Sequence, residues 1–210
     1  MAKFNSYLLG KVTKSVGNVT MCYMNKQNIA RAKIFSRKDN PTPKVLDQRA
    51  RMKVLIELSH CLLPVIRKGF VGVGNGTTSN AFVATNMGVV SVDEKHLATM
   101  DYERMVVSFG ELDVPVVSVT YSAENNKYLF EQEAQEEESG YALSDDLVYA
   151  ILFETALKRV KMVTLRNRGE SGSTSFVLPA GWDDTKVQAY CFATSVNGRL
   201  VSDSRNLVIG

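Results

Sequence analysis

The residue types that most often carry chemistry are scarce in this chain of 210 residues, which has three cysteines and two histidines. Cys22, Cys61 and Cys191 are odd in number and far apart in sequence, so we predict free thiols and no disulfide framework. With only His60 and His96 beside them, and no closely paired cysteines, the chain has little from which to build a zinc site. We therefore expect no metal and no other cofactor.

Residues 69–79, GFVGVGNGTTS, are rich in glycine and precede a helical pattern at 80–87, as phosphate-binding loops do. A P-loop ends in lysine followed by serine or threonine, and a dinucleotide fingerprint has a different glycine spacing after a buried strand. Neither pattern is present, so we interpret the stretch as a connector whose Thr78 or Ser79 caps the next helix.

No motif in the sequence carries a catalytic mechanism. His60 lies in a helical pattern and His96 in an irregular stretch, and neither has a placed acidic or nucleophilic neighbour. Partners of the Ser/His/Asp kind converge only in three dimensions, so this chemistry stays open. We predict a protein that is not an enzyme and assign no catalytic, cofactor-binding or metal-binding residue.

Charge divides the chain into two contrasting parts. Residues 1–80 hold 14 lysines and arginines against three acids, a net charge of +11, and the remainder holds 11 against 19, a net of −8. This asymmetry indicates an anionic partner for the first half, or an electrostatic match between the first half of one copy and the second half of another. The candidate interaction residues are Lys11, Lys14, Lys26, Arg31, Lys33, Arg37, Lys38 and Arg49 on the basic side, and Glu131, Glu133, Glu136, Glu137 and Glu138 on the acidic side.

The longest element that can position these residues is a helix predicted over 42–68. Apolar residues recur every four positions along it, Thr42 is a suitable N-cap, and Pro43 is tolerated in the first turn. Pro64 removes one intrahelical hydrogen bond, so we expect a kink or a break near Leu63. The broad apolar stripe must be covered by the second helix and a strand at 102–109, or by another subunit.

Before this helix, three short strands are predicted at 10–16, 19–24 and 29–35. They carry so little bulky apolar surface that they are marginal alone. One interpretation is a basic arm that binds elsewhere, and the other is a simple meander covered by the helix.

After residue 113 the pattern changes to about seven short strands with turn signals between them, which is typical of an immunoglobulin-like or fibronectin-type sandwich. The predicted strands are 114–122, 127–133, 147–154, 161–165, 174–178, 186–195 and 199–208. In the strand before Asn197-Gly198 both faces are partly apolar, so one sheet should be covered by something beyond its sandwich partner. We predict an α+β module of β-hairpins plus a long helix at 1–112, followed by an all-β immunoglobulin/fibronectin-III-like sandwich at 113–210.

Several short motifs together resemble a known family. They are Gly10-Lys-Val-Thr, Val16-Gly-Asn-Val19, Asn40-Pro-Thr-Pro, Gln48-Arg-Ala-Arg51, Gly69-Phe70, Asn80-Ala-Phe, Asn197-Gly, Leu200-Val-Ser and Ser204. Their order is similar to an uncharacterised Bacteroidetes family known as domain of unknown function 6266, and such patterns also resemble small structural proteins of phages. The resemblance implies a bacterial or phage origin, an N-terminal β-plus-helix module and a C-terminal fibronectin-like sandwich, and it implies no catalytic residues.

The sequence therefore predicts a non-enzymatic structural or assembly protein that forms homo-oligomers, as a ring, filament or virion component, through its N-terminal module. Other structural proteins are further candidate partners. The alternatives are a basic adaptor that binds nucleic acid, and a carbohydrate-binding sandwich that would use Tyr121, Tyr128, Tyr141 and Trp182. The N-terminus does not have the pattern of a signal peptide, and no apolar run is long enough to span a bilayer. We expect a cytoplasmic location at synthesis, incorporation into a phage particle as an alternative, and no membrane insertion.

Overall fold

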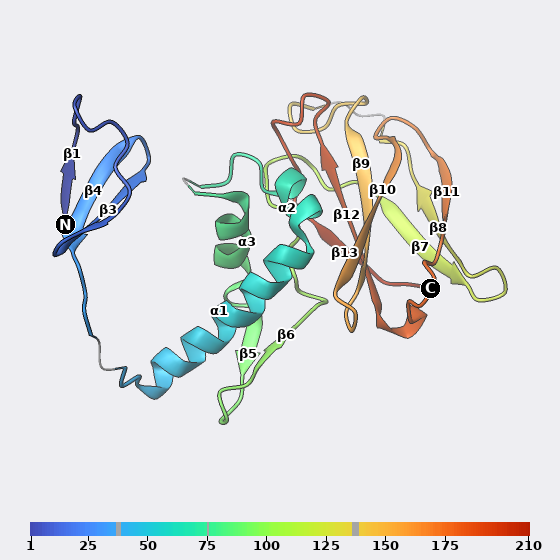
Figure 1. Cartoon of the computed structure of the whole chain (residues 1–210). Helices are drawn as coiled ribbons and strands as arrows, with labels where there is room; N and C mark the ends of the chain where they lie inside the picture. Colours follow the sequence, from blue (N-terminus) through green and yellow to red (C-terminus); the bar gives the residue numbers. More distant parts are fainter. Residues whose placement is uncertain (37–38, 75, 136–138) are drawn as a thin grey trace. The chain divides into compact units, whose positions relative to one another are not determined.

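The computed structural model describes residues 1–36, 39–74, 76–135 and 139–210, and it divides into two compact units, Met1–Pro41 and Thr42–Gly210. The described residues form a mixed α and β structure with three α-helices and several antiparallel sheets (Figure 1). The boundary predicted after residue 112 does not coincide with this division, because residues 42–112 share a unit with 113–210.

The N-terminal unit is a four-stranded antiparallel sheet, hereafter the basic sheet. Its strands are β1 (Ala2–Phe4), β2 (Lys14–Val16), β3 (Val19–Met24) and β4 (Gln27–Ala32), in the order β1-β4-β3-β2. Asn25 and Lys26 both have positive φ between β3 and β4, as the tightest hairpin turns require. The prediction missed β1, because three residues are too few to show an alternating pattern.

The predicted long helix is present, and it breaks at the position expected from Pro64. Leu62 is the C-cap of helix α1 (Pro43–Cys61). Helix α2 (Leu63–Gly69) begins at the next residue, with Pro64 in its first turn. Pro64 lacks the amide hydrogen that would continue the α1 ladder, so a new helix starts instead. Thr42 occupies the N-cap position of α1 but makes no side-chain cap bond.

The next elements differ in part from the prediction. Helix α3 (Thr78–Asn86) is capped by Thr77, whose side chain accepts from the Asn80 amide, and not by Thr78 or Ser79. A hairpin of β5 (Val90–Val92) and β6 (Ala98–Met100) follows.

The strand predicted at 102–109 is wrong. The backbone of this segment bonds to side chains and loops instead of a neighbouring strand: Val106 exchanges two 2.8 Å hydrogen bonds with the buried Asn86 amide. The amide of Phe109 donates to the Gly69 carbonyl. The sequence pattern of an apolar segment held by such hydrogen bonds is the same as that of a strand, so periodicity does not distinguish the two.

The remaining strands build two sheets. The strands are β7 (Val117–Ser122), β8 (Lys127–Gln132), β9 (Leu147–Glu154), β10 (Arg159–Asn167), β11 (Gly172–Val177), β12 (Val187–Thr194) and β13 (Arg205–Leu207). A short 3₁₀ helix, η1 (Asp184–Lys186), precedes β12. One sheet has the order β10-β9-β12-β13 and the other β11-β8-β7. The strand predicted at 199–208 shortens to β13, and the others lie within a few residues of their predicted bounds.

Two apolar cores flank the sheet that contains β9 and β12. Ala189 and Cys191 of β12 point into the core between the two sheets, while Tyr190 and Phe192 point into a second core with the helices. In that second core α1 and α2 cover the outer face of β9 and β12, and α3 packs against α1 and α2 (Figure 1). The prediction that this sheet is covered on both faces is confirmed, and residues 42–112 join the larger unit because they supply the cover.

Candidate functional site

The basic sheet has almost no apolar core. Among its described residues Ile29 is the one large apolar side chain that is buried, with 5% of its surface exposed. The other buried residue of the unit, Asn28, is polar: its Oδ1 accepts from the Val12 amide and its Nδ2 donates to the Gly10 carbonyl. The Asn28 side chain thus holds the loop before β2 to strand β4 by two hydrogen bonds, where a larger domain would use apolar packing.

Large apolar side chains instead lie on the surface of this unit. The loop after β1 exposes Tyr7, Leu8 and Leu9, with Leu8 93% exposed, and the segment after β4 exposes Ile34 and Phe35. Contiguous exposed apolar groups of this kind mark interaction sites in soluble proteins. The surface of the basic sheet therefore has the composition of an interface.

The predicted basic residues gather on the same unit. Lys11, Lys14, Lys26, Arg31 and Lys33 are all exposed there. Arg37 and Lys38 lie outside the described residues. Arg49 lies in α1, in the other unit, so the structure does not group it with the rest.

Two of these lysines lie against aromatic rings. Lys11 Nζ is 5.2 Å from the Tyr23 ring centroid, and Lys33 Nζ is 5.4 Å from that of Phe35. A groove of about 360 Å³ lies beside the first pair, with Tyr7, Lys11, Tyr23 and Lys26 among its lining residues. Two ammonium groups and two phenol rings in one groove suit a carboxylate.

Of the predicted acidic residues, Glu131 and Glu133 lie within the described part of the chain, on the outer face of the sheet β11-β8-β7, hereafter the acidic face. Both are exposed, and Glu131 belongs to β8, within the strand predicted at 127–133. Its cross-strand neighbours are Ser118 of β7 and Ser173 of β11, so the face around it carries short hydroxyl side chains. Glu136, Glu137 and Glu138 lie outside the described residues.

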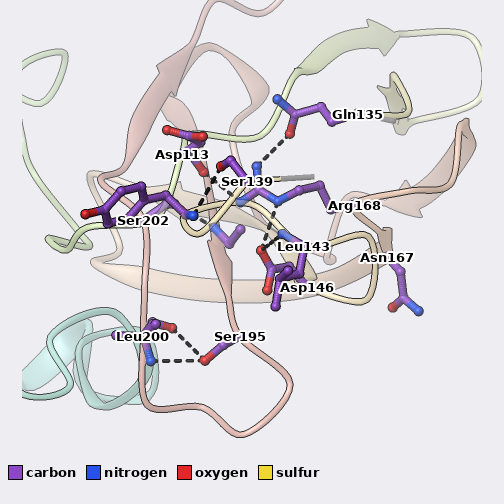
Figure 2. Close-up of polar contacts among 12 residues, drawn as sticks. Asp113, Gln135, Ser139, Leu143, Asp146, Asn167, Arg168, Ser195, Leu200 and Ser202 are labelled. Carbon is purple, nitrogen blue, oxygen red and sulfur yellow. Dashed lines mark hydrogen bonds and ion pairs between the residues drawn. The ribbon is translucent and has the colours of Figure 1, made fainter. Parts of the chain in front are cut away.

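A buried ion pair anchors the segment that follows β8 (Figure 2). Arg168 is 1% exposed, and its Nε donates to Asp146 Oδ2 at 3.1 Å. Its two other nitrogens donate to Gln135 Oε1 at 2.6 Å and to the Asp113 carbonyl at 2.7 Å. Three segments far apart in sequence are therefore joined at one guanidinium. No sequence signal indicated this role, because an arginine at the end of an alternating strand reads as a surface residue.

The histidines and cysteines considered for catalysis or metal binding do not lie together in one site among the described residues. His96 Nδ1 lies 2.5 Å from Asp47 Oδ1 and joins the β5-β6 hairpin to α1, while His60 is exposed. All three cysteines are free, and burial raises the pKa of the Cys191 thiol to about 12, which suppresses its reactive thiolate. Within the described ranges, no group of three His, Cys, Asp or Glu side chains could hold a metal ion. No described helix is long and apolar enough to cross a membrane.

The four aromatic residues proposed for a carbohydrate surface do not form one. Tyr128 and Trp182 are buried in the core between the two sheets, and Tyr141 is exposed in a loop. Tyr121 and Tyr128 are neighbours, with ring centroids 4.7 Å apart. The structure therefore does not bring all four residues together on one exposed surface.

The chain was also compared with known proteins. No curated protein and no solved structure matches it. A family model described as a family of unknown function (DUF6266) matches residues 10–208, and the chain belongs to that family.

Proposed function

We propose that this protein is a non-enzymatic structural protein that assembles with copies of itself, the basic sheet of one copy binding the acidic face of the next. Such a contact is heterologous, since it joins two different surfaces, and it builds rings when it closes and filaments when it does not. A virion component is one form of such an assembly.

The observation that carries the proposal is the contrast between the core and the surface of the basic sheet. A four-stranded sheet with Ile29 as its buried apolar residue lacks the buried area that stabilises small domains. Its exposed Leu8, Ile34 and Phe35 supply that area once a partner covers them.

Charge supports a second copy as this partner. Residues 1–41 hold eight lysines and arginines against one aspartate, a net of +7, and residues 42–210 hold 17 against 21, a net of −4. The groove lined by Lys11 and Lys26 is suited to a carboxylate, and Glu131 and Glu133 present two on a face of short side chains. Opposite charges of this kind steer association and suppress contact between like surfaces.

We further propose that strands β7 to β13 form an immunoglobulin-like or fibronectin-III-like sandwich that acts as the rigid body of the assembly. Their division into antiparallel sheets of four and three strands around a common apolar core supports this assignment.

The test is light scattering after gel filtration at 50 mM and 500 mM NaCl, with charge-reversed variants. We expect the protein to associate at low salt and to dissociate at high salt, because salt screens exposed charges. Lys11→Glu with Lys26→Glu should be monomeric, and so should Glu131→Lys with Glu133→Lys. A mixture of the two variants should associate again with the variants alternating, since the reversed groove of one meets the reversed face of the other and the unaltered groove and face also match.

Matched controls are the reversals Lys95→Glu and Glu94→Lys at the exposed β5-β6 turn, which should associate as the unaltered protein does. A monomer at every concentration and salt would overturn the proposal. Association that none of the reversals changes would equally contradict it.

A second candidate function is nucleic-acid binding, favoured by the exposed basic side chains and by Lys33 lying against the Phe35 ring. It predicts an affinity for single-stranded DNA that falls steeply with salt. If Lys11→Glu with Lys26→Glu loses DNA binding while self-association persists, this second function replaces the first.

A further inference from the structure

A separate groove lies in the larger unit, at one end of the two facing sheets. Its volume is about 450 Å³, and it is bordered by the end of β7, the start of β8, η1, the start of β12 and the residues from Asn206 to Gly210. The side chains that concern its chemistry are Glu103, Tyr121, Tyr128, Asp184, Gln188 and Asn206. None of the predicted charged interaction residues lines it, whereas Tyr121 and Tyr128, two of the aromatic residues considered for carbohydrate binding, both do.

Tyr128 is the unusual member of this set. Its side chain is fully buried, and its hydroxyl has no hydrogen-bond partner among the described residues. The other core tyrosines are paired: the Tyr190 hydroxyl donates to the Tyr102 carbonyl at 2.6 Å, and the Tyr149 hydroxyl accepts from Lys68 at 3.3 Å. A buried hydroxyl without a partner is destabilising, so a partner from outside the chain, such as a ligand hydroxyl, would stabilise it.

The Tyr128 hydroxyl is protonated at neutral pH. Burial raises the pKa of Tyr128 to about 12, with smaller contributions from Tyr121 and Asp184, which also line the groove. At neutral pH the phenol therefore keeps its proton and can donate a hydrogen bond.

Tyr121 lies beside Tyr128, and both residues line the groove. Tyr121 is half-buried, lies 4.7 Å from Tyr128 between ring centroids, and donates its hydroxyl to Asn126 in the exposed turn between β7 and β8. Because Tyr128 itself lines the groove, its hydroxyl is the candidate hydrogen-bond donor to a ligand bound there.

The remaining groups indicate the class of ligand. Glu103 and Asp184 supply carboxylates, Gln188 and Asn206 supply amides, and no lysine or arginine lines the groove among the described residues. An anion would meet two carboxylates without a cation to balance them. A neutral ligand with several hydroxyl groups fits better, because each hydroxyl both accepts and donates.

We propose that this groove binds a neutral saccharide, one hydroxyl accepting from Tyr128 and another donating to Asp184. The site is independent of self-assembly, since its residues belong neither to the basic sheet nor to the acidic face. Its failure in an experiment would leave the proposed function untouched.

The experiment is saturation-transfer-difference NMR on the full chain with four probes: glucose, galactose, mannose and N-acetylglucosamine. Glucuronate and putrescine serve as anionic and cationic controls. We expect at least one neutral sugar to bind with a millimolar dissociation constant, and Tyr128→Phe to weaken it roughly three- to tenfold, the effect of one lost hydrogen bond. Asp184→Asn should weaken binding of the same sugar. Because Asp184 is exposed, this variant should keep the fold of the unaltered protein.

The matched control is Tyr149→Phe, the same chemical change in the core on the other face of the sheet, which should leave sugar binding unchanged. Absence of binding by all four sugars would overturn the proposal. Equal binding by the unaltered protein, Tyr128→Phe and Asp184→Asn would contradict it, as would binding of putrescine alone.

Discussion

The two units of this protein are stabilised in different ways. Residues 42–210 bury two apolar cores on either side of one sheet, whereas residues 1–41 bury Ile29 and expose most of their other large apolar side chains. The first arrangement is sufficient for an independent fold, and the second is typical of a segment that is completed by a partner. Stability and interaction are therefore assigned to separate parts of the chain.

The largest expected effect is the loss of the buried arginine of the larger unit. Arg168→Met leaves the Asp146 carboxylate buried without its cation, so we expect the free energy of unfolding to fall by about 3–5 kcal/mol. Chemical denaturation of the full chain measures it. The control is Arg166→Met, an exposed position near the end of β10 and two residues before Arg168, which should change stability by less than about 0.5 kcal/mol. A loss below about 1 kcal/mol for Arg168→Met would show that the ion pair is dispensable.

The next prediction compares one core residue from each unit. Leu62→Ala removes a fully buried side chain at the junction of α1 and α2, and we expect a loss of about 2–5 kcal/mol in the main unfolding transition. Ile29→Ala should leave that transition in place and instead abolish amide-exchange protection in β3 and β4. Hydrogen exchange read by mass spectrometry separates the two outcomes. If Ile29→Ala lowered the main transition as Leu62→Ala does, the units would not be independent.

A smaller effect is expected at alkaline pH. The pKa of Tyr128 is about 12 in the folded protein and near 10 in the unfolded chain, so above pH 10 the unfolded state binds fewer protons and stability falls as pH rises. At pH 11 this single group accounts for a loss on the order of 1 kcal/mol. Tyr128→Phe should therefore show a shallower decline between pH 9 and 11 in denaturant titrations. An identical decline would mean that Tyr128 titrates normally.

The smallest effect on stability is expected on the exposed loop of the basic sheet. Leu8→Ser should change the free energy of unfolding of the larger unit by less than about 0.5 kcal/mol, because Leu8 packs against little. It should nevertheless weaken self-association in light scattering, since apolar area is lost from the interface. Leu97→Ser, at an exposed leucine of the β5-β6 hairpin, is the control and should leave association unchanged. Equal association of Leu8→Ser and the unaltered protein would remove this loop from the interface.

Local patterns predicted much of the secondary structure. The break at Pro64 follows from a missing amide hydrogen, and the alternation in β12 places Tyr190 and Phe192 on one face and Cys191 on the other. These features depend on neighbouring residues, so they can be read from one segment at a time. The strand predicted at 102–109 failed for the opposite reason, because its backbone bonds to Asn86, a residue about twenty positions away.

The candidate sites divide in the same way. The exposed lysines of the basic sheet and the glutamates of β8 could be predicted, because charged side chains remain in water in almost any fold. The Arg168 ion pair and the unpaired Tyr128 hydroxyl could not. Whether a polar group is buried, and what then faces it, depends on segments that the chain brings together only when it folds.

The sequence by itself determined the chain's family, its charge asymmetry and most of its helices and strands, since these rest on composition and short-range periodicity. The tertiary structure alone decided that residues 42–112 belong with the two-sheet body and that residues 1–41 form a unit of their own. The physical reason is the second face of the sheet containing β9 and β12. Its apolar side chains require a cover, and only the folded structure shows that the helices provide it.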